Sequence, residues 1–180
     1  MIIMFEGPDG SGKSTTISFI KGVLKSKGYT IIPNGEDLIP THPTAERRIK
    51  ENLLYRLLKD MSASDKVYLV DRGPISDFIY RVFDDYSTVT QLNKFLDALS
   101  TYKGLFIVYC KNSKSQQYML ERGEDNPTAL NRYKELTKVY DIFMSMLKCI
   151  HLSLFEYDWT KRSAKTELVN KILYFCYLRS

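Results

Sequence analysis

Short apolar runs alternate along the chain with amphipathic stretches. Strands are predicted at residues 1–5, 29–33, 66–71, 105–110 and 149–155, each followed by turn or helix signals. Between the first two runs, Ile17, Ile20 and Leu24 form one helical stripe, and Gly28 is placed as a stop. The clearest helix is predicted over 127–147, where apolar residues recur at steps of three and four.

This alternation of strand and helix favours right-handed crossovers and a parallel sheet covered on both faces. We therefore predict an α/β fold with a five-stranded parallel sheet flanked by helices. The length of 180 residues suits a single domain over 1–180. Ligands in such folds bind at the carboxyl ends of the strands, which is where the motifs of this chain fall.

The run FEGPDGSGKST, residues 5–15, follows the first predicted strand and opens a predicted helix. It contains the phosphate-loop (Walker A) pattern G-x-x-x-x-G-K-[ST], whose backbone N–H groups converge on a triphosphate. Lys13 is expected to reach the β- and γ-phosphates of ATP, and the Ser14 hydroxyl to ligate the bridging Mg²⁺. The alternative is a plain glycine-rich turn, but then the preceding strand, the following helix and the Lys-Ser pair would all be coincidental. The predicted ATP-binding residues are Gly7, Pro8, Asp9, Gly10, Ser11, Gly12, Lys13, Ser14 and Thr15.

A second motif, VYLVDRGPISDFIYR at 67–81, places Asp71 and Arg72 at the end of a predicted strand. If that strand neighbours the first one, both side chains lie near the phosphate loop. A carboxylate there suits Mg²⁺ or an attacking group, and a guanidinium suits a phosphate. The alternative is a local ion pair that ends the strand.

Together the two motifs resemble those of thymidylate kinases, P-loop enzymes with a small lid. The phosphate loop has Asp9 where that family carries an acidic residue that meets the acceptor deoxyribose, and 71–80 keeps the spacing of the family's Asp-Arg-Tyr-x-x-Ser-x-x-Ala-Tyr-Gln signature. The resemblance implies that Asp71 serves the magnesium and acceptor region, and that Arg72 binds the acceptor phosphate. It also places Ser76 and Tyr80 in the acceptor pocket and implies a homodimer.

The chain departs from the family at Gly73, Ile79 and Arg81, which replace tyrosine, alanine and glutamine of the signature. These changes concern the acceptor and leave its identity open. The family's Arg-Glu-Pro-Gly segment is not evident after the second strand, where Glu36 and Asp37 stand with no assigned role. Arg47, or its neighbour Arg48, is the candidate for a base-contacting arginine, unless these residues are only a solvated helix start.

The segment LERGEDNPTALNR, 120–132, resembles the lid of nucleoside monophosphate kinases, with the lid itself at about 120–128. A lid supplies arginines that neutralise the transferring phosphoryl group and excludes water. Arg122 is the first candidate and Arg132 the second. The alternative is an exposed turn in which neighbouring glutamates pair with Arg122.

The composition of the chain restricts the kinds of partner and of metal or disulfide site that are expected. The net charge of +5 and a pI near 9 indicate an anionic partner without separating a nucleotide from a nucleic acid. Cys110, Cys149 and Cys176 are isolated and odd in number, which fits reduced thiols better than disulfides or zinc. No secretory signal or membrane-spanning run is recognised, so the chain is expected to be cytoplasmic.

These observations predict a Mg²⁺- and ATP-dependent kinase that phosphorylates a deoxynucleoside monophosphate, with dTMP to dTDP as the leading reaction. Lys13, Asp71, Arg72 and Arg122 are the expected catalytic residues, and Ser14 and Asp71 the metal ligands. One alternative is a hydroxyl acceptor on a deoxynucleoside or a polynucleotide, with a carboxylate as base. Another is a nucleotide-dependent switch or nucleic-acid-binding module.

Overall fold

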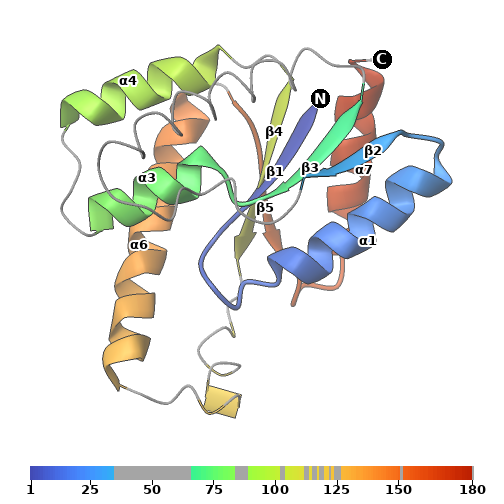
Figure 1. The fold of residues 1–180 in the computed structure, drawn as a ribbon. Helices are drawn as coiled ribbons and strands as arrows, with labels where there is room; N and C mark the ends of the chain where they lie inside the picture. The colour runs from blue at the N-terminus through green and yellow to red at the C-terminus, as the bar shows by residue number, and fades with distance from the viewer. Residues whose placement is uncertain are drawn as a thin grey trace.

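The computed structural model describes residues 1–34, 66–83, 89–101, 104–111, 114, 117, 120–121, 123, 127–150 and 152–179. The strands are β1 (Ile2–Glu6), β2 (Ile31–Asn34), β3 (Val67–Asp71), β4 (Leu105–Lys111) and β5 (Ser153–Asp158). The helices of this part of the chain are α1 (Lys13–Ser26), α3 (Pro74–Phe83), α4 (Val89–Ser100), α6 (Pro127–Cys149) and α7 (Ala164–Tyr177). Figure 1 shows them around one central sheet.

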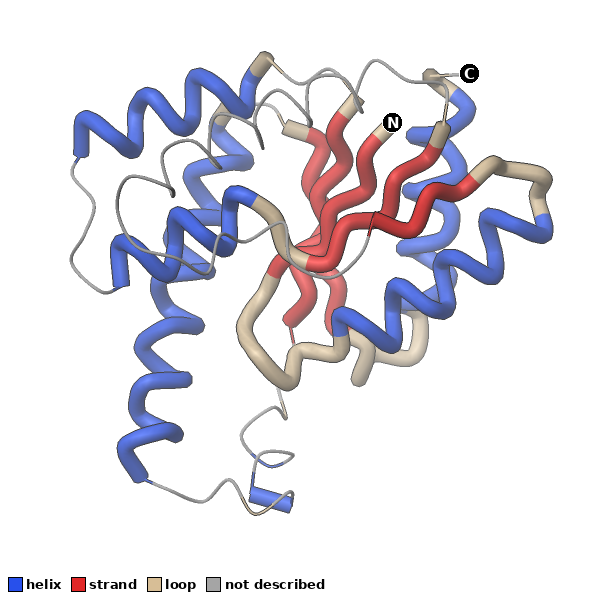
Figure 2. Tube along the Cα trace, in the orientation of Figure 1, coloured by secondary structure: helices blue, strands red, loops and turns tan. Residues whose placement is uncertain are grey.

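The strands form a sheet in the order β2-β3-β1-β4-β5, and every neighbouring pair is parallel. The predicted α/β fold with a parallel sheet is therefore confirmed. Parallel strands end at the same edge of a sheet, so the segments that follow β1 and β3 leave side by side (Figure 2). Because Phe5 pairs with Asp71 in this register, the two predicted motifs meet at that edge.

Helices cover both faces of the sheet (Figure 1): α1 and α7 lie on one face and α3, α4 and α6 on the other. Successive strand residues point to opposite faces, and β1 shows this clearly. Ile2 and Met4 belong to the core under α3, α4 and α6, whereas Ile3 and Phe5 belong to the core under α1 and α7. β1 is thus buried on both sides, as a near-continuous apolar run predicts.

Several element boundaries differ from the prediction by one to four residues, and the largest difference is at the start of β5. The run 149–155 was expected to be one strand, but α6 continues to Cys149 and β5 begins only at Ser153. A short apolar run at a helix end has no period that separates helix from strand, which explains the error. Pro33 lies within β2, at the edge of the sheet, where a residue without an N–H is tolerated.

Candidate active site

The segment between β1 and α1 wraps tightly against the end of β4. Gly7 has a φ of 143°, and a Cβ atom on it would lie 2.4 Å from the carbonyl oxygen of Cys110. No other residue fits this position without moving backbone, because the obstructing atom is itself main chain. The neighbouring strand therefore fixes the start of the loop.

The same segment ends at Gly12, the N-cap residue of α1. Its φ is 82°, and a Cβ atom there would lie 2.7 Å from Cδ1 of Trp159. No side-chain hydrogen bond caps this end of α1, so its first N–H groups face the loop. A helix N-terminus preceded by a glycine-rich loop is an anion-binding arrangement, as the sequence motif predicts.

The Lys13 side chain folds back over the loop and is 7% exposed. Its ammonium donates to the carbonyl oxygens of Gly7 (2.9 Å) and Pro8 (2.8 Å), and to Oγ of Ser11 (3.4 Å). Burial is the main cause that lowers the pKa of Lys13, and the positive charge of Arg72 acts in the same direction. The Lys13 ammonium therefore lies directly at the phosphate loop, where a bound phosphate would contact it.

Ser14, in the first turn of α1, and Asp71, at the end of β3, come together at the edge where β1 and β3 lie side by side. The Ser14 hydroxyl donates to Oδ2 of Asp71 at 3.1 Å. A hydroxyl and a carboxylate are hard oxygen ligands that suit Mg²⁺, which binds few protein groups and completes its shell with phosphates and water. Among the described residues, no group of three or more His, Cys, Asp or Glu side chains is placed so that it could hold a metal ion.

Arg72 has a left-handed backbone, with φ of 60°, and its guanidinium points across to the phosphate loop. Nη2 pairs with the Asp9 carboxylate, and Nη1 donates to the Tyr80 hydroxyl at 3.3 Å. The guanidinium carbon also lies 5.7 Å from the centre of the Tyr80 ring. The alternative interpretation, a local ion pair of Asp71 with Arg72, is not among the described contacts, in which Arg72 pairs with Asp9 and Asp71 accepts from Ser14.

Ser76, predicted for the acceptor pocket, is fully buried and contacts Glu6 and Tyr140. The Ser76 hydroxyl is therefore occupied by contacts inside the protein. Other predicted residues lie outside the described part of the chain: Arg122, Arg47, Arg48, Glu36 and Asp37. Arg132 lies on α6, with its guanidinium carbon 5.5 Å from the ring centre of Phe83.

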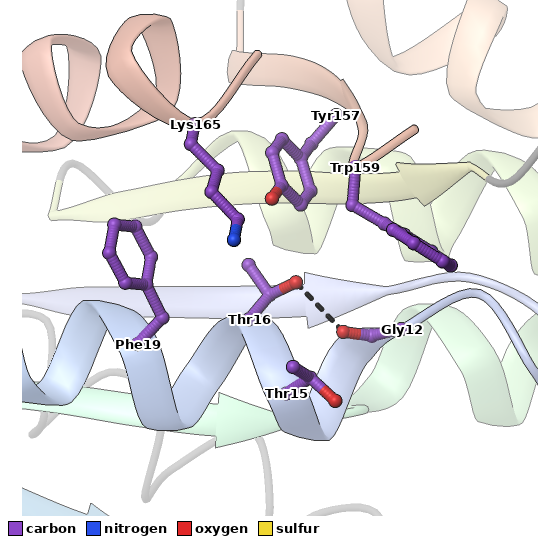
Figure 3. Close-up of a pocket in the computed structure, with 7 residues that line it drawn as sticks. All are labelled: Gly12, Thr15, Thr16, Phe19, Tyr157, Trp159 and Lys165. Atoms are coloured by element: carbon purple, nitrogen blue, oxygen red, sulfur yellow. Dashed lines mark hydrogen bonds between the residues drawn. The ribbon is translucent and has the colours of Figure 1, made fainter. Parts of the chain in front are cut away.

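Two features of this site go beyond the predicted site residues. Glu6, at the end of β1, is a fully buried carboxylate in contact with the turn that carries Arg72. The sequence does contain a signal for Glu6, because it is a charged residue at the end of an otherwise apolar strand. The second feature is a pocket of about 150 Å³ beside the loop (Figure 3), lined by Gly12, Thr15, Thr16, Phe19, Tyr157, Trp159 and Lys165.

This pocket lies between α1 and the segment that follows β5. Two rings, Phe19 and Tyr157, stand on either side of Lys165, and its ammonium lies 5.5 Å from the Phe19 ring centre. The Thr16 hydroxyl turns to the Gly12 carbonyl oxygen at 2.8 Å. The lining is mainly apolar with few polar groups, which is typical of a site for a flat organic ligand.

The chain is similar to thymidylate kinases. A thymidylate kinase of an Exiguobacterium strain is 32% identical over 111 residues, which cover 61% of this chain and 51% of that protein. The thymidylate kinase of Prosthecochloris aestuarii is 31% identical over 110 residues, covering 58% and 46%. That of Exiguobacterium sibiricum is 24% identical over 202 residues, covering 95% and 93%. The chain thus spans about half the length of the first two relatives, and no protein-family model matches it.

Solved structures share the fold over nearly the whole chain. The Bacillus subtilis YorR protein, crystallised with phosphorylated GDP, has a TM-score of 0.61 at 21% identity and covers 99% of this chain and 97% of its own. Deoxyadenosine kinase from M. mycoides has a TM-score of 0.57 at 20% identity, covering 97% and 100%. The predicted resemblance to thymidylate kinases is confirmed by the relatives, and these structures confirm the fold.

Proposed function

We propose that this protein is a P-loop nucleotide kinase that transfers the γ-phosphoryl group of ATP to the phosphate of a deoxynucleoside monophosphate, with dTMP as the first candidate. The observation that carries the proposal is the Ser14–Asp71 hydrogen bond, which joins the phosphate loop to the second motif at one sheet edge. The relatives named thymidylate kinase support a phosphate acceptor. The structural neighbour named deoxyadenosine kinase supports phosphoryl transfer in general, because a nucleoside presents a hydroxyl and not a phosphate as acceptor. A single domain, a homodimer and a cytoplasmic location remain predictions.

The donor side is the phosphate loop with its adjoining pocket. Backbone N–H groups from Gly7 onward and the start of α1 would bind the triphosphate, and Lys13 would neutralise its terminal charge. The pocket lined by Phe19, Tyr157 and Trp159 adjoins the loop, and its mainly apolar walls suit the donor base. Ser14 and Asp71 would hold Mg²⁺, which supplies charge neutralisation when bound.

The acceptor side is the turn after β3. Arg72 projects from it towards Asp9 and Tyr80, and a guanidinium can bind two oxygens of a phosphate at once. An arriving acceptor phosphate would replace the Asp9 carboxylate as the partner of Arg72, and Asp9 would become available to a sugar hydroxyl. This exchange explains why an exposed carboxylate and the guanidinium lie together at this point.

The chemistry needs alignment more than proton transfer. An oxygen of the acceptor phosphate attacks the γ-phosphorus, the bond from that phosphorus to the β,γ-bridging oxygen breaks, and ADP leaves. The attacking oxygen is already anionic, so no general base is required. The chain would contribute positioning and positive charge through Lys13 and Arg72, with Arg122 as the predicted lid arginine.

A coupled assay of ADP formation tests this function. It would run with ATP and Mg²⁺ against a panel of deoxynucleoside monophosphates, the matching deoxynucleosides, and a short single-stranded oligonucleotide. Turnover confined to monophosphates supports the proposal. Turnover only with nucleosides or the oligonucleotide would replace it with a hydroxyl acceptor, and ADP formation without any acceptor would favour a nucleotide-dependent switch.

A further inference from the structure

Glu6 is a charged residue in an apolar place. It is the last residue of β1, fully buried, and directly follows Phe5, which is also fully buried. Burial raises the pKa of its carboxyl from 4.5 to about 7, although the hydrogen bond from Ser76 and the charge of Lys13 oppose the shift. A buried carboxyl of this kind is tolerated only with hydrogen-bond partners, so those partners indicate its role.

The first partner is the turn that carries Arg72. Arg72 has a φ of 60°, a left-handed conformation that is strained for a residue with a Cβ. Two hydrogen bonds to β1 flank it: Arg72 N–H donates to the Phe5 carbonyl oxygen at 3.0 Å, and Gly73 N–H donates to Oε1 of Glu6 at 2.9 Å. The strained residue is therefore fixed on both sides by β1.

The second partner is Ser76, in the first turn of α3. Its hydroxyl donates to Oε2 of Glu6, and its oxygen lies 2.8 Å from the Tyr140 hydroxyl of α6. Ser76 is fully buried, and Tyr140 is fully buried as well. The Glu6 carboxyl thus connects β1, the Arg72 turn, α3 and α6 beneath the proposed acceptor side.

We propose that Glu6 is a positioning residue, whose carboxyl oxygen, bound to Gly73 N–H and Ser76, keeps Arg72 in the left-handed conformation that directs its guanidinium to the acceptor phosphate. Glu6 itself is buried and touches no substrate. This inference rests on the proposed function, in which Arg72 binds the acceptor. It predicts that loss of the Glu6 carboxyl oxygen raises the KM for the acceptor and leaves the affinity for ATP unchanged.

Two substitutions at Glu6 distinguish the effect of its carboxyl oxygen from the effects of its charge and of its side-chain volume. Glu6→Leu keeps a buried side chain of similar size but leaves Gly73 N–H without its acceptor, whereas Glu6→Gln keeps an oxygen in a neutral group. We expect Glu6→Leu to raise the acceptor KM about tenfold and Glu6→Gln to stay within about threefold of the original protein. ATP affinity, followed by the fluorescence of Trp159, should not change in either variant. Glu135→Leu, at an exposed position of α6, is the matched control.

A double-mutant cycle distinguishes positioning from general damage. If Glu6 acts through Arg72, adding Glu6→Leu to Arg72→Ala should change the acceptor KM by less than about twofold. Full additivity of the two effects would overturn the proposal. So would a Glu6→Leu protein that folds, as judged by its circular dichroism, and keeps the acceptor KM of the original chain.

A ligand-free measurement keeps this inference separate from the proposed function. Amide hydrogen exchange at Gly73 should be at least about tenfold faster in Glu6→Leu than in the original protein and close to the original rate in Glu6→Gln. If no nucleotide is phosphorylated but exchange changes in this way, the positioning of the turn stands and the proposed function fails. If phosphorylation occurs and neither exchange nor acceptor KM responds to Glu6→Leu, the function stands and the positioning role is overturned.

Discussion

The proposed donor and acceptor sides of this site are built in different ways. The phosphate-binding part of the proposed donor side is one continuous segment, formed by the backbone of Gly7 to Gly12 and the start of α1. The acceptor side is assembled from side chains that are far apart in the sequence: Asp9, Arg72 and Tyr80, supported from below by Glu6. Backbone sites are specified by local sequence, whereas assembled sites depend on the register of the whole sheet.

This difference explains how much could be predicted. The phosphate loop was predicted residue by residue because its motif encodes a backbone shape. The meeting of Ser14 and Asp71 was predicted only on the condition that their strands are neighbours, and the register of β1 with β3 supplied that condition. The contacts of Arg72 with Asp9 and Tyr80 needed a left-handed φ that no sequence pattern indicates for an arginine.

Glu6 was missed for a related physical reason. Its partners, Gly73 and Ser76, lie 67 and 70 positions away, and hydrogen bonds at such separation leave no local pattern. Ser76 was predicted from family resemblance as an acceptor-pocket residue, but its buried contacts place it in the supporting layer. Gly73, which replaces the tyrosine of the family signature, is closely packed: a Cβ there would lie 2.7 Å from Cε of Met4.

Loss of the donor-side cation should have the largest effect. Lys13→Ala removes the ammonium that the loop carbonyls of Gly7 and Pro8 hold, and turnover should fall about 1,000-fold or more. The coupled ADP assay measures this, with Lys25→Ala in the exposed last turn of α1 as the control. Substantial turnover in Lys13→Ala would remove Lys13 from the mechanism.

Loss of the acceptor-side cation should separate the two sides. Arg72→Ala removes the group proposed to bind the acceptor phosphate, and within the phosphate loop it removes only the partner of the exposed Asp9 carboxylate. We expect the acceptor KM to rise about 100-fold while ATP affinity stays constant. Arg179→Ala, in an exposed turn after α7, controls for loss of surface charge. If Arg72→Ala impaired ATP affinity alone, Arg72 would belong to the donor side.

The pH dependence of stability tests the layer beneath the acceptor side. Burial raises the pKa of Glu6 from 4.5 to about 7 in the folded state, so folded protein retains a proton that unfolded chain releases. The associated stability is present below pH 4.5 and is lost as the pH rises to about 7, a loss of up to about 3 kcal/mol. Urea unfolding at pH 5 and pH 8 should show a smaller decrease for Glu6→Gln than for the original protein. Equal decreases would mean that Glu6 ionises normally.

A glycine substitution sharpens the account of the donor side. At Gly12, with its φ of 82°, an added Cβ would lie 2.7 Å from Trp159, so Gly12→Ala should weaken ATP binding about tenfold. Trp159 is the only tryptophan of the chain, and its fluorescence reports the binding directly. Gly22→Ala is the matched control, because nothing lies within 4 Å of the added atom. Identical ATP affinity in both variants would show that Trp159 does not constrain the loop.

Among the helices of the described residues, none has the length and apolarity needed to traverse a bilayer. The sheet edge at which the two motifs meet is the surface on which the proposed function depends. Its donor and acceptor sides become one active site only if a phosphoryl group passes between them. Neither binding data nor ADP formation alone establishes that transfer.

The most direct measurement follows the phosphoryl group itself. ATP labelled with ³²P at the γ-position would be incubated with Mg²⁺, dTMP and the protein, and the products separated by chromatography, with Lys13→Ala as the blank. The account predicts label in dTDP with the original protein and none with Lys13→Ala. Label that is found only in inorganic phosphate, or in no deoxynucleoside diphosphate from any monophosphate tested, would contradict it.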